Sequence, residues 1–409
     1  MVLKIGIISD LHCHQLAKHN EEIEYEKRLG HILEKKKESY IITDSTLPIP
    51  QDPYLSFKEL IKQQKKNGLN IDVDLLVALG DMGNKGCPVG IKRGWEVVKD
   101  MGIMMNAKSI VSTVGNHDVD SRKIFNSDPF HLIQNLDVTF PTTKQLNNKD
   151  YWKNGFTIIE NEHYNLLLIN SVHNHKNEKE AEHGLFSDES MNMLENSLQN
   201  IDVSKLGIAI CHHCPMEHSR MGSKNTDLMY NGDQLIPLLD QFNFEIIIHG
   251  HKHDPMLRYG SGSGDSSIVF SAGSFSGFQD ILLPAGGMNT FHVIYININQ
   301  NSRSTGIIDT WFFVPTKGWK KEVPNPYFKS KVGFGTRIDI KNKAQKIFDW
   351  FLSSEKKQLL YLSEFIPYFP ELSFLIPIDL ERLIIELKRK KILISKGDIN
   401  EDTRIEFKN

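Results

Sequence analysis

Residues 4–12 read KIGIISDLH, an apolar run that ends in two residues able to bind a metal ion. The run is typical of a buried β-strand, because strands covered on both faces are almost continuously apolar. Asp10 and His12 are two residues apart, and in extended backbone this spacing places both side chains on the same face. The stretch therefore predicts a core strand that brings a carboxylate and an imidazole to one place.

Four further fragments combine apolar runs with polar residues in the same way. They are Gly80-Asp81, Gly115-Asn116-His117-Asp118, Cys211-His212-His213 and Gly250-His251-Lys252-His253. Open α/β sheets place ligands at the carboxyl ends of their strands, so we expect these side chains to gather at one edge of a sheet. Carboxylate, imidazole and amide oxygen suit Mn²⁺, Fe or Zn²⁺, and the lack of thiols argues against a structural zinc site.

Short runs of Ile, Leu and Val alternate with amphipathic segments along most of the chain. Strands are predicted over 4–9, 73–79, 109–114, 166–169, 207–210, 245–248, 268–270 and 292–296. Helices are predicted over 56–66, 90–101, 187–200 and 233–242, with Ser187 and Asp233 as N-caps. Strands without intervening helices after Ser267 argue against one parallel sheet. The predicted fold class is α/β, with two mixed β-sheets packed together and flanked by helices.

The length, composition and net charge of the chain are those of an ordinary globular protein. The chain has 409 residues, 40% of them apolar and 24% charged, which is typical of a globular protein. Its formal net charge of −3 gives no strong bias toward polyanions as a whole. The opening run is too short for a signal peptide, and no window is apolar enough to span a membrane. Four cysteines without a regular framework favour a reducing cytoplasm.

Beyond about Gly318 the pattern changes. Helices predicted over 341–353, 357–365 and 379–391, followed by a hairpin over 392–407, resemble a winged helix, a module that binds DNA or docks on proteins. A basic cluster at 388–391 lies at the end of the third helix, whereas helix-turn-helix readers present base contacts from its beginning. Basic residues at a helix end also favour the helix dipole, so nucleic-acid contact through this module stays open.

The domain organisation expected from these patterns has two parts. A main domain that carries the five polar fragments covers 1–317, with an insertion at about 14–72, and a winged-helix-like accessory domain covers 330–409. The insertion contains a Glu- and Lys-rich stretch over 21–38 that is predicted to be helical. The insertion forms either a lid over the site or a solvent-exposed segment on the surface. The sequence does not define an oligomeric state.

Taken together, the five fragments resemble the calcineurin-like metallophosphoesterases. That family has the pattern D-x-H, G-D, G-N-H-D/E, a histidine after a strand and G-H-x-H, and each element is present in order over 4–253. The resemblance implies a two-sheet sandwich and two divalent metal ions. By position, one metal would be held by Asp10, His12, Asp81 and His253, and the other by Asp81, Asn116, His212 and His251.

The resemblance also implies roles for residues beside the metals. His117 is the expected catalytic residue, either stabilising the transition state or protonating the leaving alkoxide, and Asp118 is expected to orient it. Of the adjacent histidines His212 and His213, we expect His212 to be the metal ligand. Asn84 stands three residues after Asp81, where many relatives have Asp, so the support that this position gives the site is in question.

The expected enzyme is a metal-dependent phosphoric ester hydrolase, with Mn²⁺ as the first choice of metal and Fe or Zn²⁺ as alternatives. Two metals clamp the attacking and leaving oxygens and supply hydroxide near neutral pH. A phosphodiesterase acting on a cyclic nucleotide or another small diester is the leading hypothesis. A nuclease that holds nucleic acid with the C-terminal module, or a nucleotide-sensing regulatory protein, is the alternative.

Overall fold

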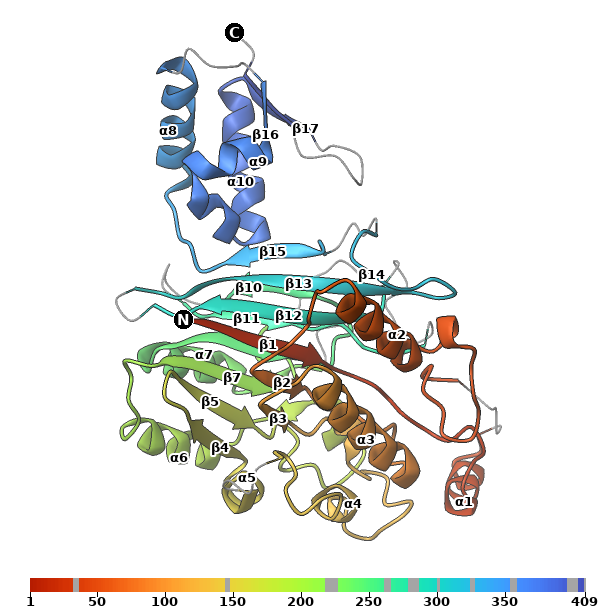
Figure 1. Ribbon diagram of the computed structural model, residues 1–409. Coiled ribbons are helices and arrows are strands. Elements are labelled where there is room, and N and C mark those ends of the chain that lie inside the picture. The colour runs from red at the N-terminus through yellow and green to blue at the C-terminus, as the bar shows by residue number, and fades with distance from the viewer. Residues whose placement is uncertain are drawn as a thin grey trace.

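The structure is a computed structural model. It describes residues 1–31, 37–143, 148–217, 227–260, 266–278, 287–299, 302–323, 328–353, 359–395 and 404–407, apart from the side chain of residue 182. Within these ranges two mixed sheets pack face to face and helices cover their outer faces (Figure 1). The predicted fold class is confirmed.

The first sheet has the strand order β14-β13-β12-β1-β2-β3, with β15 paired to β13. β1 runs parallel to β2 and β2 parallel to β3, while β12 pairs antiparallel with β1. The strands are β1 (Val2–Ile8), β2 (Leu75–Ala78), β3 (Ser109–Ser112), β12 (Thr290–Asn297), β13 (Thr305–Val314), β14 (Gly318–Lys320) and β15 (Lys331–Phe334).

The second sheet has the order β10-β11-β9-β7-β5-β4, in which β5, β7, β9 and β11 are parallel. Its strands are β4 (Phe156–Glu160), β5 (Tyr164–Ile169), β7 (Leu206–Cys211), β9 (Phe244–His249), β10 (Met256–Tyr259) and β11 (Ile268–Ser271). A short parallel pair, β6 (Gly184–Leu185) and β8 (Met229–Tyr230), lies apart from both sheets.

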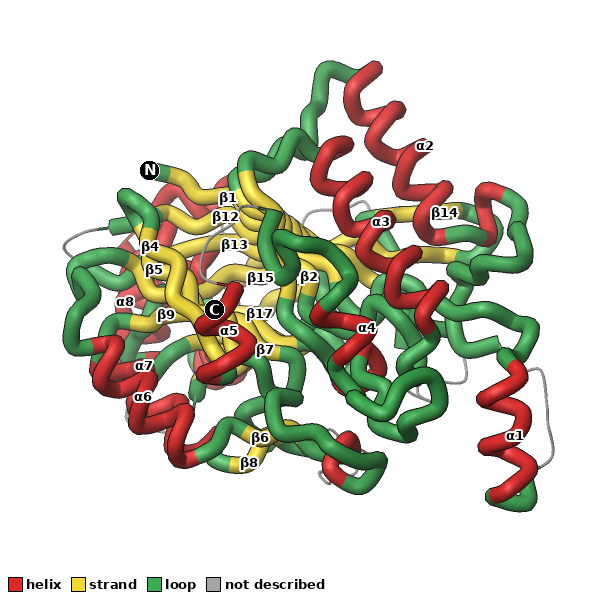
Figure 2. Tube along the Cα trace, turned by 90° about the horizontal axis from the view of Figure 1, so that it is seen from below, coloured by secondary structure: helices red, strands yellow, loops and turns green. Residues whose placement is uncertain are grey.

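Helices cover both outer faces, as Figures 1 and 2 show from two directions. The α-helices before residue 260 are α1 (Asn20–Arg28), α2 (Pro53–Lys66), α3 (Pro88–Met104), α4 (His131–Gln134), α5 (Asn148–Asn154), α6 (Asp188–Leu198) and α7 (Gly232–Gln241). Short 3-10 helices are η1 (Ile49–Gln51), η2 (Asn116–Asp118) and η3 (Glu180–Glu182). None of the helices in the described ranges is long and apolar enough to cross a membrane.

The apolar runs of the second sheet are continuous because both faces of each strand are buried. In β9, Ile246 and Ile248 belong to the core between the sheets, whereas Ile247 packs with α6 and α7 on the other face. Side chains of a strand alternate between its two faces, so each face of β9 contributes to a different core. The run therefore stays buried on both faces up to His249, where β9 ends just before His251 and His253.

Three local predictions differ from the structure. The helix expected over 21–38 is α1, which ends at Arg28, and residues 37 and 38 are not helical. The N-cap of α7 is Asn231, whose φ of 65° is not helical, so Asp233 lies inside the first turn, where a carboxylate favours the dipole. The segment 359–361, expected to be helical, is strand β16 (Leu359–Tyr361) before the short helix α9 (Leu362–Phe365). Leu360 is buried against Ile405 of the partner strand, and this tertiary pairing outweighs local helix propensity.

The C-terminal segment has its own core. It comprises α8 (Ile340–Ser353), β16, α9, η4 (Ile366–Tyr368), η5 (Pro370–Phe374), α10 (Pro377–Arg389), β17 (Ile392–Ser395) and β18 (Arg404–Phe407). Three helices and a three-stranded sheet match the expected winged helix, although the predicted hairpin turn near Gly397 lies outside the described residues. β15 falls within the range expected for this module, yet pairs with β13 of the first sheet.

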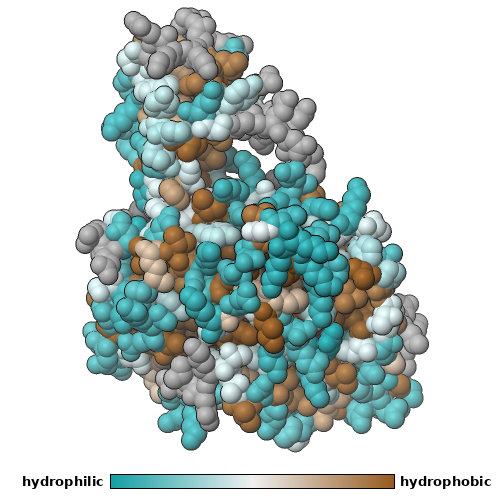
Figure 3. Space-filling model, viewed as in Figure 1, coloured by the Kyte–Doolittle hydropathy of each residue, from teal (hydrophilic) through white to brown (hydrophobic). Residues whose placement is uncertain are grey.

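The module projects from the main body in the space-filling view (Figure 3). The beginning of α10 faces the main body, because the Tyr259 hydroxyl of β10 donates a hydrogen bond to Asp379. The Arg337 guanidinium lies 3.4 Å from the centre of the Tyr259 ring. Ile376, just before α10, is fully buried in the core of the main body. The first turn of α10 is therefore part of the contact between the two parts.

Candidate metal centre

The predicted ligands lie just beyond the carboxyl ends of strands from both sheets. Asp10 and His12 follow β1, Asp81 follows β2, and Asn116 begins η2 after β3. From the second sheet, His212 follows β7, and His251 and His253 follow β9. The side chains gather as expected, but where the ends of two sheets meet rather than at the edge of one sheet: the His251 backbone N–H donates to the Asp10 carboxylate at 3.1 Å.

One group of side chains contains Asp10, His12 and His253. His253 Nε2 is 3.2 Å from Asp10 Oδ1 and 3.0 Å from His12 Nε2. Asp81 Oδ2 lies 3.7 Å from His12 Nε2. These are the four residues predicted to surround the first metal.

The second group contains Asp81, Asn116, His212 and His251. His212 Nε2 is 3.3 Å from Asp81 Oδ2 and 3.1 Å from Asn116 Oδ1. His251 Nδ1 is 3.2 Å from His212 Nε2. Asp81 thus contacts histidines of both groups, as a residue bridging two metals would.

The pairing of donor atoms fits a divalent cation in each group. His12 Nε2 and His253 Nε2 face each other at 3.0 Å. At most one hydrogen fits between these two nitrogens, so at least one of them presents a lone pair. The Leu79 carbonyl accepts from His212 Nδ1 at 2.7 Å, so Nε2 is the ring nitrogen that faces Asp81. This nitrogen donates to Asp81 in the ion-free protein, and after losing that proton it would be the one to bind a metal. Imidazole, carboxylate and amide oxygen together suit Mn²⁺, Fe or Zn²⁺.

The backbone of the ligands is strained in a systematic way. Asp10, His12, Asp81, His251 and His253 have φ values of 53°, 49°, 52°, 69° and 52°. Non-glycine residues rarely adopt this left-handed conformation, and such strain clusters at functional sites. The conformation turns each side chain back toward the strand ends.

The glycines of the motifs allow two loops to touch backbone to backbone. Gly80 has a φ of 90°, and a Cβ there would lie 2.5 Å from the Gly115 nitrogen. A Cβ on Gly115 would lie 2.1 Å from Asp81 Oδ1. Any side chain at either position would separate Asp81 from Asn116.

Electrostatics keep the centre anionic. Burial alone would raise the pKa of Asp10 and Asp81, but neighbouring histidines, His253 for Asp10 and His212 for Asp81, lower it further than burial raises it. Burial would lower the pKa of His212, yet the Asp81 charge raises it to about 9. Two buried carboxylates that stay ionised create a site that attracts cations.

His117 is held by a partner other than the expected one. Both Asp118 oxygens accept from backbone N–H groups, of Gly83 at 2.9 Å and Gly115 at 3.0 Å, so the carboxylate joins two loops instead of orienting His117. Burial and the Asp81 charge raise the pKa of Asp118 to about 7. The His117 ring instead contacts Asn84, whose Oδ1 is 2.7 Å from His117 Nδ1.

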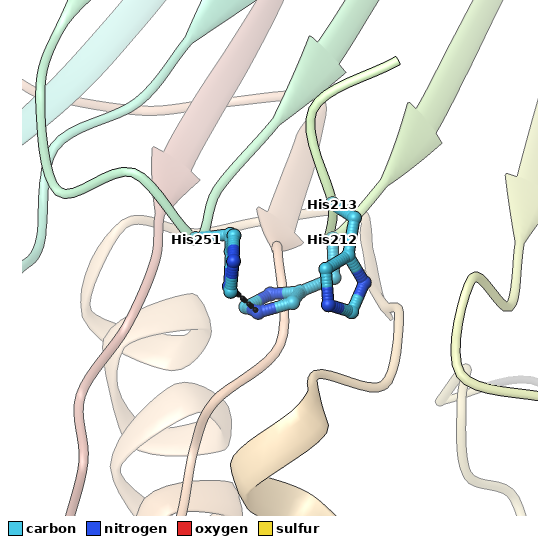
Figure 4. A group of neighbouring side chains, drawn as sticks. All are labelled: His212, His213 and His251. Atoms are coloured by element: carbon cyan, nitrogen blue, oxygen red, sulfur yellow. Dashed lines mark hydrogen bonds between the residues drawn. The ribbon is translucent and has the colours of Figure 1, made fainter. Parts of the chain in front are cut away.

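The histidine pair after β7 is divided between two environments. Figure 4 shows His212 turned toward His251, with His213 beside them. His213 Nδ1 is 2.9 Å from Ser171 Oγ, and its ring centre is 4.4 Å from that of His251. One ring nitrogen from each of these three histidines lies within 4.8 Å of the others, but only His212 also reaches Asp81 Oδ2 at 3.3 Å. This placement favours His212 as the ligand.

Two carboxylates beside the site were not expected from the sequence. Glu38, from the insertion, accepts hydrogen bonds from Asn84 Nδ2 and Lys85 Nζ. Asp227 Oδ2 is 3.3 Å from His251 Nε2, and the Asp227 carboxylate also pairs with Lys252. Neither belongs to a motif, and no local pattern marks them, since both reach the site from loops distant in sequence.

A small cavity opens beside His117. It measures about 70 Å³, and its lining includes Lys85, Asn116, His117, Arg122 and Glu178. Glu178 accepts from Arg122 Nε at 2.9 Å and from the Tyr25 hydroxyl at 2.8 Å. Because Tyr25 lies in α1, the insertion reaches the rim of this cavity.

Comparison with known proteins agrees with this geometry. Residues 3–255 match the family model of calcineurin-like phosphoesterases, and residues 332–389 match a model named wHTH-Calcineurin_assc, a winged helix-turn-helix module. A curated relative, a probable cyclic nucleotide phosphodiesterase of Psychrobacter arcticus, is 26% identical over 229 residues, which cover 55% of this chain and 72% of the relative.

Solved structures give more distant likenesses. The phosphopantetheinyl hydrolase of Mycobacterium tuberculosis is 12% identical with a TM-score of 0.34, covering 66% of this chain and 89% of its own. A metallophosphoesterase from Sphaerobacter thermophilus is 12% identical with a TM-score of 0.27, covering 72% and 83%. With a family model spanning most of its length and a complete set of candidate ligands where the two sheets meet, the chain belongs to the calcineurin-like phosphoesterases, metal-dependent hydrolases of phosphoesters.

Proposed function

We propose that this chain is a dinuclear-metal-dependent phosphodiesterase that hydrolyses a cyclic nucleotide or another small phosphodiester. The observation that carries the proposal is the arrangement of seven candidate ligands in two groups that share Asp81, with His117 at the border between them and the cavity. Asp10, His12, Asp81 and His253 would hold one ion, and Asp81, Asn116, His212 and His251 the other. Divalent ions bound there supply Lewis acidity and activate water for attack on phosphorus.

The chain's own residues position the substrate and move the proton. His117 lies next to the ligand Asn116, and its backbone N–H donates to Asp81 Oδ1 at 2.8 Å, which fixes the start of its side chain. Its ring lines the cavity, where the leaving group would lie. Imidazole at this position protonates or hydrogen-bonds the departing oxygen, a contribution of about 10²- to 10⁴-fold in comparable enzymes.

The charges around the cavity support a diester over a monoester. Both cations in its lining are already neutralised, since Lys85 pairs with Glu38 at 2.6 Å and Arg122 with Glu178 at 2.9 Å. A monoester dianion needs uncompensated positive charge beside the metals, whereas a diester carries a single negative charge. The named activity of the Psychrobacter relative points to a cyclic nucleotide within this class.

A nuclease that uses the C-terminal module is the second candidate, and the structure gives it less support. Helix-turn-helix readers contact bases from the beginning of the recognition helix, and in α10 that end contacts Tyr259. Near the other end, Arg389 pairs with Glu386 and Lys390 donates to Gln345, so part of the basic cluster is occupied within the module. Both observations weigh against nucleic-acid binding through α10.

The remaining features are proposed on the same basis. We divide the chain into a phosphoesterase domain over 1–317 and a winged-helix domain over 330–409, with β15 attached to the first sheet. Mn²⁺ is the first choice of metal, with Fe or Zn²⁺ as alternatives, because imidazole, carboxylate and amide oxygen without thiolate suit all three ions. Four buried cysteines without disulfides support a reducing cytoplasm as the compartment.

The test is a Mn²⁺-supplemented screen of bis-aryl and aryl phosphates, cyclic nucleotides and single- and double-stranded DNA. Wild type is compared with Asp81→Asn, which removes the shared carboxylate, and with Asp233→Asn on an exposed turn of α7 as a matched control. We expect wild type and the control to hydrolyse the diester, and Asp81→Asn to lose at least about 100-fold of that activity. Removing a residue that only supports a metal ligand costs about 10- to 100-fold, and Asp81 would be a ligand itself. Equal activity in wild type and Asp81→Asn would refute the proposed mechanism.

A further inference from the structure

His117 lies at the end of a hydrogen-bonded chain that begins in the insertion. Glu38 accepts from Asn84 Nδ2, and Asn84 Oδ1 in turn lies 2.7 Å from His117 Nδ1. The same Asn84 oxygen is 3.4 Å from Nδ1 of His12, a proposed metal ligand. One amide therefore faces two imidazoles on one side and a carboxylate on the other.

The direction of this amide determines which histidine nitrogen carries hydrogen. An amide oxygen only accepts, so with Oδ1 toward the rings, Nδ1 of His117 must be the protonated nitrogen. The reversed amide would present its N–H groups to the rings and favour the other tautomer. Asn84 alone has no reason to prefer one direction, because its two ends are nearly the same shape.

Glu38 supplies that preference. Its carboxylate accepts but does not donate, so only the Nδ2 end of Asn84 can face it. Its second oxygen is held by Lys85 Nζ at 2.6 Å, and the Glu38 side chain is only 14% exposed. Burial would raise the pKa of Glu38, but Lys85 and the hydrogen bond from Asn84 lower it to about 2, so the group is ionised at neutral pH.

We propose that Glu38 is a positioning residue for the reaction at His117. It locks the Asn84 amide with its oxygen toward His117 Nδ1, which leaves Nε2 of that ring to face the cavity. Nε2 can there take up a proton from water, and the resulting imidazolium gives that proton to the departing oxygen. Glu38 and Asn84 together do here what a single carboxylate at position 84 would do alone. This inference rests on the proposed function of His117, and it assigns a chemical task to a residue of the insertion.

The arrangement predicts how substitutions at positions 38 and 84 act singly and together. Glu38→Gln removes the charge and lets the amide reverse. Asn84→Asp places a carboxylate against Glu38, so two like charges meet in a buried place and disturb the site. In the double variant, the carboxylate introduced at position 84 would accept directly from His117 Nδ1, and the introduced glutamine amide would donate to its other oxygen. Each single change should therefore be harmful and the combination should restore function.

The experiment measures kcat and KM of the full chain with Mn²⁺ and an alkyl phosphodiester. We expect Glu38→Gln to lower kcat about 10- to 100-fold with little change in KM, the usual effect of removing a partner of this kind. Asn84→Asp should also lower kcat, and Glu38→Gln with Asn84→Asp should recover most of it. Glu59→Gln is the matched control, because Glu59 is a glutamate of the same insertion that pairs with Lys62 at 2.8 Å on the surface.

A second readout does not depend on turnover. Nitrogen-15 NMR of histidine-labelled, metal-free protein distinguishes the two tautomers, and the His117 signal is identified by its absence in His117→Gln. Wild type and the double variant should show a single Nδ1–H tautomer, and Glu38→Gln a mixture. Circular dichroism establishes that each variant is folded.

The outcomes separate this inference from the proposed function. Wild-type kcat in Glu38→Gln, or a double variant no better than Glu38→Gln, overturns the positioning role while leaving the metal mechanism in place. Activity that survives Asp81→Asn instead refutes the mechanism itself. Rescue in the double variant, together with the tautomer change, is a result that loss of local structure cannot produce.

Discussion

Replacing Asp118 by Asn tests whether this carboxylate is structural or chemical. Its two oxygens accept from the backbone N–H groups of Gly83 and Gly115 at 2.9 and 3.0 Å, and the side chain is fully buried. An asparagine offers one oxygen, so its NH₂ group must face the other N–H. One backbone hydrogen bond is lost, and two buried donors, the backbone N–H and the asparagine NH₂ group that faces it, are left unpaired. At about 1–3 kcal/mol for each donor, the total is roughly 3 kcal/mol.

Peptide-resolved hydrogen exchange is the suitable assay, because a chain with two cores need not unfold in one step. A loss of about 3 kcal/mol in local opening free energy corresponds to exchange about 100-fold faster in peptides that contain Gly83 or Gly115. The control is Asp309→Asn, which loses a surface ion pair with Lys321 and should change exchange little. Unchanged exchange at both glycines together with lost activity would refute the structural assignment and return Asp118 to a direct role beside His117.

Two further predictions concern single histidines. His117→Ala should retain both metals, measured by elemental analysis, and should lower kcat more for alkyl than for nitrophenyl leaving groups, because nitrophenolate needs no proton; loss of metal would contradict this role. His292 is buried in β12, and burial lowers its pKa from 6.5 to about 3. The unfolded state therefore binds the proton more readily, and stability is lost as pH falls below about 6.5. Between about pH 7.5 and 5.5, the opening free energy from hydrogen exchange of β12 peptides, corrected for the intrinsic exchange rate, should fall about 1 kcal/mol more in wild type than in His292→Gln. Identical losses would argue against burial as the cause.

The sequence predicted the parts of the fold that depend on local pattern. Strands such as β5, β7 and β9 are buried on both faces, so their apolar runs stand out from the surrounding chain. The ligands were predictable for a related reason, since each polar fragment follows a strand and the carboxyl ends of parallel strands share an edge. β16 was not predictable, because Leu359–Tyr361 becomes a strand only by pairing with β18.

The surroundings of the ligands depend on contacts that are distant in sequence. Glu38 reaches Asn84 across 46 residues, and no spacing rule connects them. The expected pairing of Asp118 with His117 followed from their adjacency, but η2 turns the carboxylate back to the Gly83 and Gly115 amides. Adjacent positions in a tight turn point in different directions, so sequence proximity is a poor guide to the partner of a side chain.

The left-handed backbone at five of the ligands has a consequence for how such a site is inherited. Each of these conformations costs about 1–3 kcal/mol, less for Asp and His than for bulkier residues, and glycine at the same position would remove most of that cost. A descendant freed from catalysis would gain stability by replacing these residues with glycine. Selection for metal binding is therefore needed to keep non-glycine residues at these positions. Substitution of the ligands by glycine would be an early sign that a lineage no longer uses the metals.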